Sequence, residues 1–440
     1  MRLTTRQALN ESIGTTVEIA GRILSIRDFG KLAFYTLQDE AGKIQLVAKE
    51  PLSLSLGDIV SVVGERFKTK AGEESVLIST TTILTKAALQ PPANFYGLQD
   101  KEIRYRKRYL DMMVNRDVFE RFKQRSKIIT LIRTFLNKSE FTEVETPVLQ
   151  PLYGGTNARP FKTRINAYAM DMYLRIAPEL YLKRLLVGGY EKIYEIGKNF
   201  RNEGVDQTHN PEFTMMEWYE AYTDYQGTMD RAEKLLRFIA NETNNSLFSS
   251  EPWPRIRMID LINQELDLDV EQISHDELAA ICTKLECPIS STSSRGQLIF
   301  ALFESMTQKI IDPTWIIDYP KEVSPFAKEK ISAPGYVERF ELYINGKEIC
   351  DGWTEITDPI IQRERFENEQ KEMRAGNEEA HPMDTDFIEA LSYGMPPTGG
   401  IGIGIDRIIM LFTDTWSIRE IIHFPIMKPT SGISESESEK

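Results

Sequence analysis

The first part of the chain alternates apolar and polar residues in short runs. Alternation over residues 16–23, 33–37, 43–47, 58–65 and 75–78 is interrupted by turn-forming residues. A period of two is typical of strands that bury one face. Five such strands in close succession predict a small closed barrel of the OB type, whose open face binds oligonucleotides, although other small barrels share this pattern. Pro91-Pro92 marks the end of the region.

Helical and strand patterns then alternate. Apolar residues recur at helical spacing over 118–138, and strands surround a helix at about 178–186 within 165–225. Residues 230–312 are mostly helical, with helix starts at Ser274 and Ser294. Strands return over 314–353, followed by a charged helix over 359–374, a glycine-rich strand and a last helix. The sequence shows no internal repeat.

Composition limits the class of protein. Of 440 residues, 41% are hydrophobic and 27% charged, which excludes a fully disordered or fibrous chain and leaves room for two or three domains. No apolar run is long enough to span a membrane, and the N-terminal residues lack the apolar segment of a secretory signal. Three cysteines and four histidines do not supply a disulfide framework, a four-cysteine zinc site or a histidine-rich metal centre. We expect a soluble protein of the reduced cytoplasm, without membrane contact.

Charge is unevenly distributed along the chain. The net charge of −13 bears on solubility more than on partners. Residues 101–108 (KEIRYRKR) carry five basic residues and one acid, whereas residues 431–440 (SGISESESEK) form an acidic tail of low complexity. We expect this tail to be disordered.

A first candidate site lies in residues 190–222, where two strand-like runs flank a polar loop at 202–210. Alternation separates two faces, one with Phe213, Met215, Glu217 and Tyr219 and the other with Met216 and Trp218. A face that mixes an aromatic ring, a carboxylate and a phenol suits a ligand better than a core. Arg201 ends the first strand-like run, where its guanidinium would bind a phosphate or a carboxylate through two hydrogen bonds. A solvated hairpin with a surface salt bridge explains this stretch alone equally well.

A second candidate is the hairpin expected in residues 338–355 (ERFELYINGKEICDGWTE), because Asn345-Gly346 is a strong two-residue turn signal. That turn pairs Ile344 with Lys347, Tyr343 with Glu348, and Glu341 with Cys350. Glu341 and Glu348 then share one face as diagonal neighbours. Two adjacent carboxylates repel each other unless a cation or a proton joins them, so Mg²⁺ bridged to a nucleotide is a natural occupant.

The pattern does not decide on which face the other acids of this hairpin lie. Simple alternation puts Asp351 and Glu355 on the face opposite Glu341, and a bulge at Gly352 would reverse this for Glu355. An exposed hairpin whose acids face water is the commoner arrangement for any one acidic hairpin.

Residues 396–412 (PPTGGIGIGIDRIIMLF) form the third candidate. The glycines allow a close approach to the strand, and Arg407 follows in the first turn of a helix. They lie within the strand, and no Gly-Lys-Ser/Thr follows, so neither a dinucleotide fingerprint nor a Walker A loop fits. Close helix–strand packing alone would also explain the glycines. No Gly-x-Ser-x-Gly elbow is present, which disfavours a triad hydrolase.

Together these stretches resemble the signature motifs of class II aminoacyl-tRNA synthetases. The first motif is matched by 141–147 (FTEVETP) with its preceding helix, at the family's dimer interface; the second by 199–203 (NFRNE) with 209–213 (HNPEF); and the third by 402–407 (GIGIDR). From about residue 15 to 429 the chain is similar to lysyl-tRNA synthetases within this class. The supporting strings include 174–185 (LRIAPELYLKRL) and 213–219 (FTMMEWY).

The resemblance implies an α+β fold. An N-terminal OB-type β-barrel would precede a class II catalytic domain, built as an antiparallel sheet flanked by helices with a helical insertion at about 230–312. The implied domains are an anticodon-binding barrel (1–90), a basic linker (91–114), the catalytic domain (115–430) and the disordered acidic tail (431–440). The resemblance also implies a cytoplasmic homodimer that acts on ATP, L-lysine and tRNA(Lys), with Mg²⁺ as cofactor.

Site residues carry over by motif position. Arg201 would contact the α-phosphate and the lysine carboxylate, and Arg407 the γ-phosphate, which makes these two the catalytic candidates. The remaining ATP-binding residues would be Glu203, His209, Asn210, Phe213 and Glu341, with Phe213 stacking on adenine, and Mg²⁺ would be held by Glu341 and Glu348. Lysine would be bound by Gly155 and Glu179 at its α-amino group, by Tyr219 and Glu355 at its ε-ammonium, and also by Glu217 and Asp351. In the barrel, the anticodon would be read by Arg27, Phe34, Gln45 and Glu73, with Phe34 stacking on a base.

The chemistry of the residues agrees with a cationic substrate. A pocket for an ammonium group needs acids and few competing cations, and Glu179, Glu217 and Glu355 supply the acids. Relatives specific for aspartate need an arginine where this hairpin offers Glu355. Lysyl transfer to a protein acceptor and a non-catalytic tRNA-binding homologue remain the alternatives.

Some positions depart from the family pattern. Asp351 stands where the family usually has Asn, and this extra acid would either raise the pKa of a neighbouring carboxylate or tune the fit of the site to the ammonium group. Cys350 replaces a frequent Gly, and Thr208 sits where many members have Arg. The barrel is short, because only residues 50–56 separate two strands where the family usually has a helix.

Overall fold

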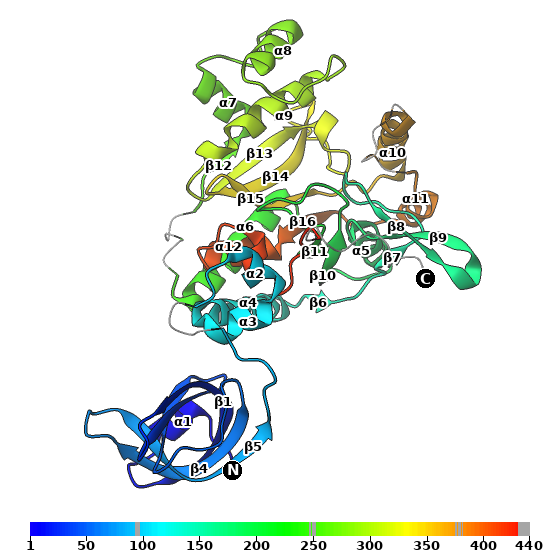
Figure 1. The fold of residues 1–440 in the computed structure, drawn as a ribbon. Helices are drawn as coiled ribbons and strands as arrows, with labels where there is room; N and C mark the ends of the chain where they lie inside the picture. Colours follow the sequence, from blue (N-terminus) through cyan, green and yellow to red (C-terminus); the bar gives the residue numbers. More distant parts are fainter. Residues whose placement is uncertain are drawn as a thin grey trace. The chain divides into compact units, whose positions relative to one another are not determined.

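The computed structural model describes residues 1–92, 97–245, 248, 252–374, 376, 380 and 382–429. The chain forms two compact units, Met1–Glu120 and Arg121–Lys440, which are described separately (Figure 1). The acidic tail expected over residues 431–440 lies outside the described residues.

Five strands close into a barrel in the first unit, in the order β1-β2-β3-β5-β4. They are β1 (Thr16–Asp28), β2 (Ala33–Gln38), β3 (Lys43–Ala48), β4 (Ile59–Lys68) and β5 (Glu74–Thr85). In β2 the alternation is complete: Ala33, Tyr35 and Leu37 are buried in the barrel core, and the residues between them are half-buried. The five predicted strands and the OB-type barrel are confirmed.

Three short helices complete the first unit: α1 (Thr5–Asn10), α2 (Lys101–Arg106) and α3 (Arg108–Val114). The last two contain the basic stretch. Arg104 donates to Oδ1 of Asp111 at 3.0 Å, and Arg108 donates to Oδ2 of the same carboxylate at 2.6 Å. Because Arg108 and Asp111 are fully buried, at least one of these cations serves the local fold rather than a partner.

The second unit is built on an eight-stranded sheet in the order β12-β13-β14-β15-β16-β11-β10-β6. The strands are β6 (Thr142–Glu143), β10 (Lys192–Phe200), β11 (Glu212–Ala221), β12 (Arg255–Arg257), β13 (Thr314–Pro320), β14 (Tyr336–Ile344), β15 (Lys347–Thr354) and β16 (Thr398–Gly404). The six central strands pair antiparallel, as predicted, whereas both edge strands, β6 and β12, pair parallel with their neighbours. A smaller sheet consists of β7 (Leu149–Gln150), β8 (Phe161–Ile165) and β9 (Met170–Leu174).

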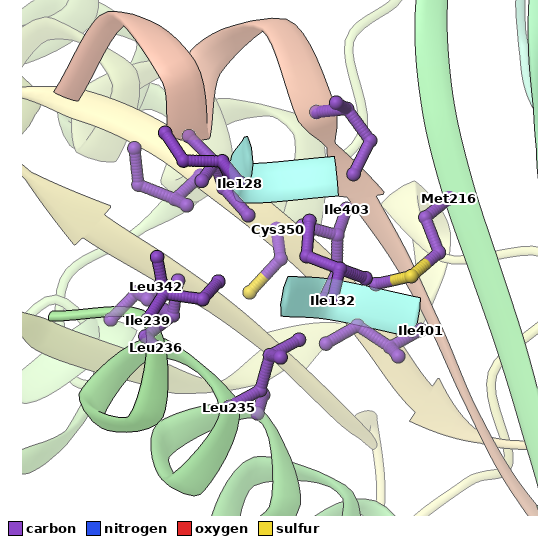
Figure 2. Close-up of a cluster of buried hydrophobic side chains, with 14 of the residues drawn as sticks. Ile128, Ile132, Met216, Leu235, Leu236, Ile239, Leu342, Cys350, Ile401 and Ile403 are labelled. Carbon is purple, nitrogen blue, oxygen red and sulfur yellow. The ribbon is translucent and has the colours of Figure 1, made fainter. Parts of the chain in front are cut away.

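Helices α4 (Arg116–Lys138), α6 (Tyr225–Thr243) and α12 (Ile405–Phe412) pack on one face of the large sheet. Figure 2 shows Ile128 and Ile132 of α4 and Leu235 of α6 gathered around Cys350, Ile401 and Ile403 from the sheet. The expected helix over 118–138 is confirmed as α4. This apolar layer leaves the opposite face of the central strands free to carry polar groups.

The other helices of this unit are α5 (Glu179–Val187), α7 (Met258–Leu266), α8 (His275–Lys284), α9 (Arg295–Met306), α10 (Pro359–Arg374) and α11 (Thr385–Ser392). Figure 1 shows α7, α8 and α9 gathered beside β12 and β13, with which they share a second apolar core. Ser274 and Ser294 cap α8 and α9 as predicted, and the charged helix α10 has the predicted bounds. Within the described residues, no helix is long and apolar enough to cross a membrane.

The hairpin of β14 and β15 corrects one prediction. Ile344 pairs with Lys347 and Tyr343 with Glu348 as expected, but the next pair is Leu342 with Cys350. Ile349 is therefore an extra residue, a β-bulge that advances the register of β15 by one. The predicted pairing of Glu341 with Cys350 is wrong. Glu341 lies opposite Asp351 instead. Asp351 is therefore on the same face as Glu341, whereas simple alternation predicted the opposite face.

Candidate active site

A cavity of about 380 Å³ opens on the sheet face opposite the apolar core of Figure 2. Strand β11 separates the two faces as predicted: Met216 and Trp218 pack into the core, and Glu217 and Tyr219 line the cavity. All the residues that the resemblance implies at the catalytic centre line this cavity. They are Gly155, Glu179, Arg201, Glu203, His209, Asn210, Phe213, Glu217, Tyr219, Glu341, Glu348, Asp351, Glu355 and Arg407.

The glycines of β16 make room for side chains of the cavity. A Cβ on Gly400 would stand 2.1 Å from Oε1 of Glu355 and 2.6 Å from Cε1 of Tyr219. A Cβ on Gly402 would stand 2.3 Å from the terminal methyl group of Met215. The third sequence motif therefore serves the site by lacking side chains where its neighbours need space.

Three buried carboxyl groups form one end of the cavity: Glu179, Glu217 and Glu355. Tyr219 donates its hydroxyl to Oε2 of Glu217 at 2.9 Å. Burial, and then the charge of Glu179, raises the pKa of Glu217 to about 8. Burial also raises the pKa of Glu355 to about 8, against the lowering effect of Lys183. An ammonium group bound here would favour the charged forms and offset the cost of their burial.

The expectation of few competing cations is wrong at one position. Lys183 is fully buried on α5 and donates to Oε1 of Glu179 at 2.5 Å and to Oε2 of Glu355. It is absent from the cavity lining, so it lies behind the carboxylates. Sequence reasoning missed Lys183, although its i,i+4 spacing from Glu179 on a predicted helix was a usable signal.

Arg339 is a second cation that sequence reasoning missed. Its guanidinium donates to both oxygens of Asp351, at 2.9 and 3.0 Å, and to Oε1 of Glu341 at 2.7 Å. Tyr343 donates to the other oxygen of Glu341 at 2.7 Å. The extra acid at 351 is thus paired within the protein. Alternation on β14 would have placed Arg339 on the face of Glu341.

Glu341 and Glu348 are the candidate metal ligands, and they face the same cavity despite the bulge. Burial, together with the charges of Asp351 and Glu348, raises the pKa of Glu341 to about 8 against the lowering effect of Arg339. For Glu348, burial also acts upward, but Arg407 and Arg339 outweigh it and lower the pKa. Asp351 thus raises the pKa of a neighbouring carboxyl group, that of Glu341, as the sequence led us to expect.

The donor set fits Mg²⁺ carried by a nucleotide. No group of three or more His, Cys, Asp or Glu side chains in the described ranges could hold a metal ion by itself. Mg²⁺ commonly takes one or two protein carboxylates and completes its shell with phosphate oxygens and water. Two carboxylates beside Arg407, whose Nη1 lies 3.3 Å from Oε2 of Glu348, suit that division.

Guanidinium groups mark the other end of the cavity. Arg201 is half-buried and lies over the ring of Phe213, 5.1 Å from its centroid, and desolvation lowers its pKa. Its Nε has no hydrogen-bond partner within the described part of the chain, and neither has Oδ1 of Asn210. His209 is held through Nδ1, 2.9 Å from Oδ2 of Asp206. Unsatisfied buried groups of this kind are natural contacts for a polar ligand.

Asp406 connects this end to helix α4. Its Oδ1 accepts from Arg125 of α4 at 2.6 Å, and its Oδ2 accepts from the backbone N–H of Thr214 at 2.8 Å. Arg125 also donates to the hydroxyl of Thr214 at 3.1 Å. These hydrogen bonds join α4, β11 and α12 at Asp406, the residue before Arg407.

The four anticodon-reading candidates lie in the barrel unit. Arg27 lies over the ring of Phe34, 5.6 Å from its centroid, and donates to Oε1 of Gln45 at 2.9 Å. Phe29, which is 70% exposed, meets Phe34 edge-on with centroids 5.8 Å apart. Glu73 lies just before β5, where its backbone carbonyl accepts from the hydroxyl of Ser75, which in turn accepts from the side chain of Gln45. Three of the candidates thus form one aromatic and polar cluster.

Comparison with known proteins identifies the family. Residues 100–428 match the model described as tRNA synthetases class II (D, K and N), and residues 17–84 match that of the OB-fold nucleic acid binding domain. The lysine–tRNA ligase of Clostridium novyi is 46% identical over 445 positions, which cover 96% of this chain and 87% of the relative. The lysine–tRNA ligase of Thermotoga maritima is 45% identical over 447 positions, with coverage of 96% and 88%. The chain belongs to the class II tRNA synthetases and, within them, to the family of these lysine–tRNA ligases.

Proposed function

We propose that this chain is a lysine–tRNA ligase. It would activate L-lysine with ATP to form lysyl-adenylate and then transfer lysine to the 3′ end of tRNA(Lys). The observation that carries the proposal is one cavity with buried carboxyl groups at one end and half-buried guanidinium groups at the other. A molecule with two ammonium groups fits the first end, and phosphates fit the second.

Lysine is assigned to the acidic end. Gly155 and Glu179 would take the α-amino group, and Tyr219 and Glu355, with Glu217 behind the phenol, would take the ε-ammonium. Lys183 pairs with Oε2 of Glu355, so a neutral side chain would leave Oε1 of this carboxylate buried without a donor, at a cost of roughly 1–3 kcal/mol. Asp351 lines the same space, but Arg339 already binds its carboxylate, so we assign it the role of holding Arg339.

ATP is assigned to the guanidinium end. Phe213 would stack on adenine, Arg407 would meet the γ-phosphate, and Arg201 would bridge the α-phosphate and the lysine carboxylate. The other nucleotide contacts would come from Glu203, His209, Asn210 and Glu341. Mg²⁺, when bound by Glu341 and Glu348, would neutralise charge on the phosphates.

The proposed chemistry is positional. The lysine carboxylate attacks the α-phosphorus in line with the departing pyrophosphate, while Arg201 and Arg407 stabilise the charge that builds on the phosphates. The ribose 3′-hydroxyl of the terminal adenosine then attacks the carbonyl carbon of the adenylate, so that the ester to lysine forms, the anhydride bond breaks and AMP leaves with the proton released. No protein nucleophile is needed for either step.

The remaining assignments concern partners. We assign tRNA recognition to the barrel, where Arg27, Phe34 and Gln45 form a cluster with an accessible aromatic ring and Glu73 lies at the start of a neighbouring strand. We also propose a cytoplasmic homodimer, formed through the first motif at 141–147 and helix α4.

The experiment that tests the function is ATP–pyrophosphate exchange across the twenty standard amino acids, without tRNA. Exchange with lysine alone supports the assignment, and charging of tRNA(Lys) then separates it from lysyl transfer to a protein acceptor. Exchange with another amino acid, or with none, would refute it; the second result favours a non-catalytic homologue. Glu355→Gln should weaken lysine far more than ATP, and an equal loss of both would contradict the role of Glu355.

A further inference from the structure

Lys183 is a buried cation to which the assignments above give no role. Its side chain is fully buried, lies behind the cavity lining and pairs with Glu179 and Glu355. These two carboxylates are assigned to opposite ends of the substrate, Glu179 at the α-amino group and Glu355 at the ε-ammonium. One ammonium group of the protein thus contacts the groups that would hold both ends of lysine.

Lys183 contacts only one oxygen of each carboxylate, which leaves the other oxygen available to a ligand in the cavity. Lys183 takes Oε1 of Glu179, whose Oε2 lies 3.6 Å from the place where a Cβ on Gly155 would stand. It also takes Oε2 of Glu355, which accepts from Trp353 at 2.8 Å as well. Oε1 of Glu355 is buried with no hydrogen-bond partner among the described residues. A buried carboxylate oxygen without a donor is costly, and a ligand's ammonium group would satisfy it.

We propose that Lys183 is a positioning residue that sets the distance between these two carboxylates, and thereby selects the length of the diamino acid that binds. The inference rests on the proposed function. An ammonium group shared by two carboxylates holds them at a fixed separation, whereas without it they would repel each other and move apart. A diamino acid one methylene shorter than lysine, L-ornithine, then cannot satisfy both carboxylates at once.

The test is ATP–pyrophosphate exchange with L-lysine and with L-ornithine, each at varied concentration. A fitted pocket discriminates one methylene by about 10–200-fold, and we expect the wild-type preference for lysine to lie in this range. Lys183→Met keeps the length of the side chain but removes its charge. We expect it to lower the ratio of kcat/KM for lysine over ornithine by about tenfold, through the KM for lysine, with the KM for ATP unchanged.

Two further variants separate positioning from stability. Arg184 is the next residue of α5, points away from the cavity lining and pairs with Asp384 at 2.8 Å. Arg184→Met should lower the melting temperature and leave the lysine-to-ornithine ratio unchanged. Lys183→Arg keeps the positive charge and should fold even where Lys183→Met does not. Its wider guanidinium would spread the two carboxylates, so the ratio should fall again.

The outcomes are distinct. A fall in the ratio at position 183 and none at position 184 supports the inference. An unchanged ratio in Lys183→Met, or in Lys183→Arg if the methionine variant is unfolded, would overturn it, because Lys183 would then act on stability alone. The wild-type protein is measured first: no exchange with lysine would overturn the proposed function itself and this inference with it.

Discussion

A single methyl group on Gly400 should weaken lysine binding strongly and leave ATP binding almost unchanged. The added Cβ would stand 2.1 Å from Oε1 of Glu355 and 2.6 Å from Cε1 of Tyr219, the two side chains proposed to bind the ε-ammonium. Lys183 pairs with Glu355, and Tyr219 donates to Glu217, so the methyl group fits only if one of these side chains leaves its present position. The backbone of Gly400 is not in the left-handed region, so an alanine suits the strand and the clash falls on the site.

The size of the effect follows from the contact that is lost. A hydrogen bond between charged groups contributes about 1.5–3 kcal/mol. At about 1.4 kcal/mol per factor of ten, moving Glu355 out of reach should raise the KM for lysine by about 10–150-fold. The KM for ATP should stay within about threefold of the wild-type value, because the nearest ATP-binding candidates lie at the other end of the cavity.

The assay is ATP–pyrophosphate exchange with each substrate varied in turn, and Gly402→Ala is the matched control. Gly402 also lies on the cavity side of β16, but its Cβ would meet only the flexible end of Met215, which can turn away. We expect its effect on the KM for lysine to be the smaller of the two. Equal losses of lysine in both variants, or an equal loss of lysine and ATP in Gly400→Ala, would refute the placement of the ε-ammonium against Glu355.

Three further predictions concern the barrel, the pH dependence and the metal. Phe34→Ala should raise the KM for tRNA by about 5–150-fold, the equivalent of one base stack, while adenylate formation is unchanged; unaltered charging kinetics would remove Phe34 from the tRNA site. The pKa of Glu217 and of Glu355 is about 8 against a reference of 4.5, so the stability that their protonation gives is present at acid pH and is lost as pH rises through about 8. L-lysine should therefore raise the melting temperature more at about pH 8 than at about pH 6, and an increment that does not change with pH would contradict these shifts. Glu348→Gln should raise the Mg²⁺ concentration for half-maximal exchange by at least about tenfold, whereas Glu304→Gln, in the same cavity lining, should not; similar shifts in both would argue against Glu348 as a ligand.

Alternation predicted the faces of β11 correctly because that strand buries one face and exposes the other to the cavity. Alternation failed in β15 beyond the pair of Tyr343 with Glu348, where the register of the hairpin shifts. Ile349 and Cys350 are consecutive and both buried, at 3% and 1% exposure, which a regular strand cannot achieve on one face. Two adjacent apolar residues between acids were therefore the sequence signal of the bulge.

The two buried cations show what single-sequence reasoning lacks. The contact of Lys183 with Glu179 lies within one helix, and a helical pattern could have revealed it. Its contact with Glu355 joins segments far apart in the chain, and the bulge at Ile349 decides on which face Glu355 lies. Motif resemblance transferred the residues proposed to contact substrates, but it said nothing of Lys183 or Arg339, which pair with carboxylates of that set.

The meeting point at Asp406 has a mechanical consequence. Its carboxylate joins Arg125 of α4 to the backbone of β11, one residue before the Arg407 proposed to hold the γ-phosphate. Helix α4 is also the helix proposed at the dimer interface. In the proposed dimer, the position of Arg407 would therefore depend on the partner subunit, and dilution that separates the subunits should weaken ATP binding before the protein unfolds.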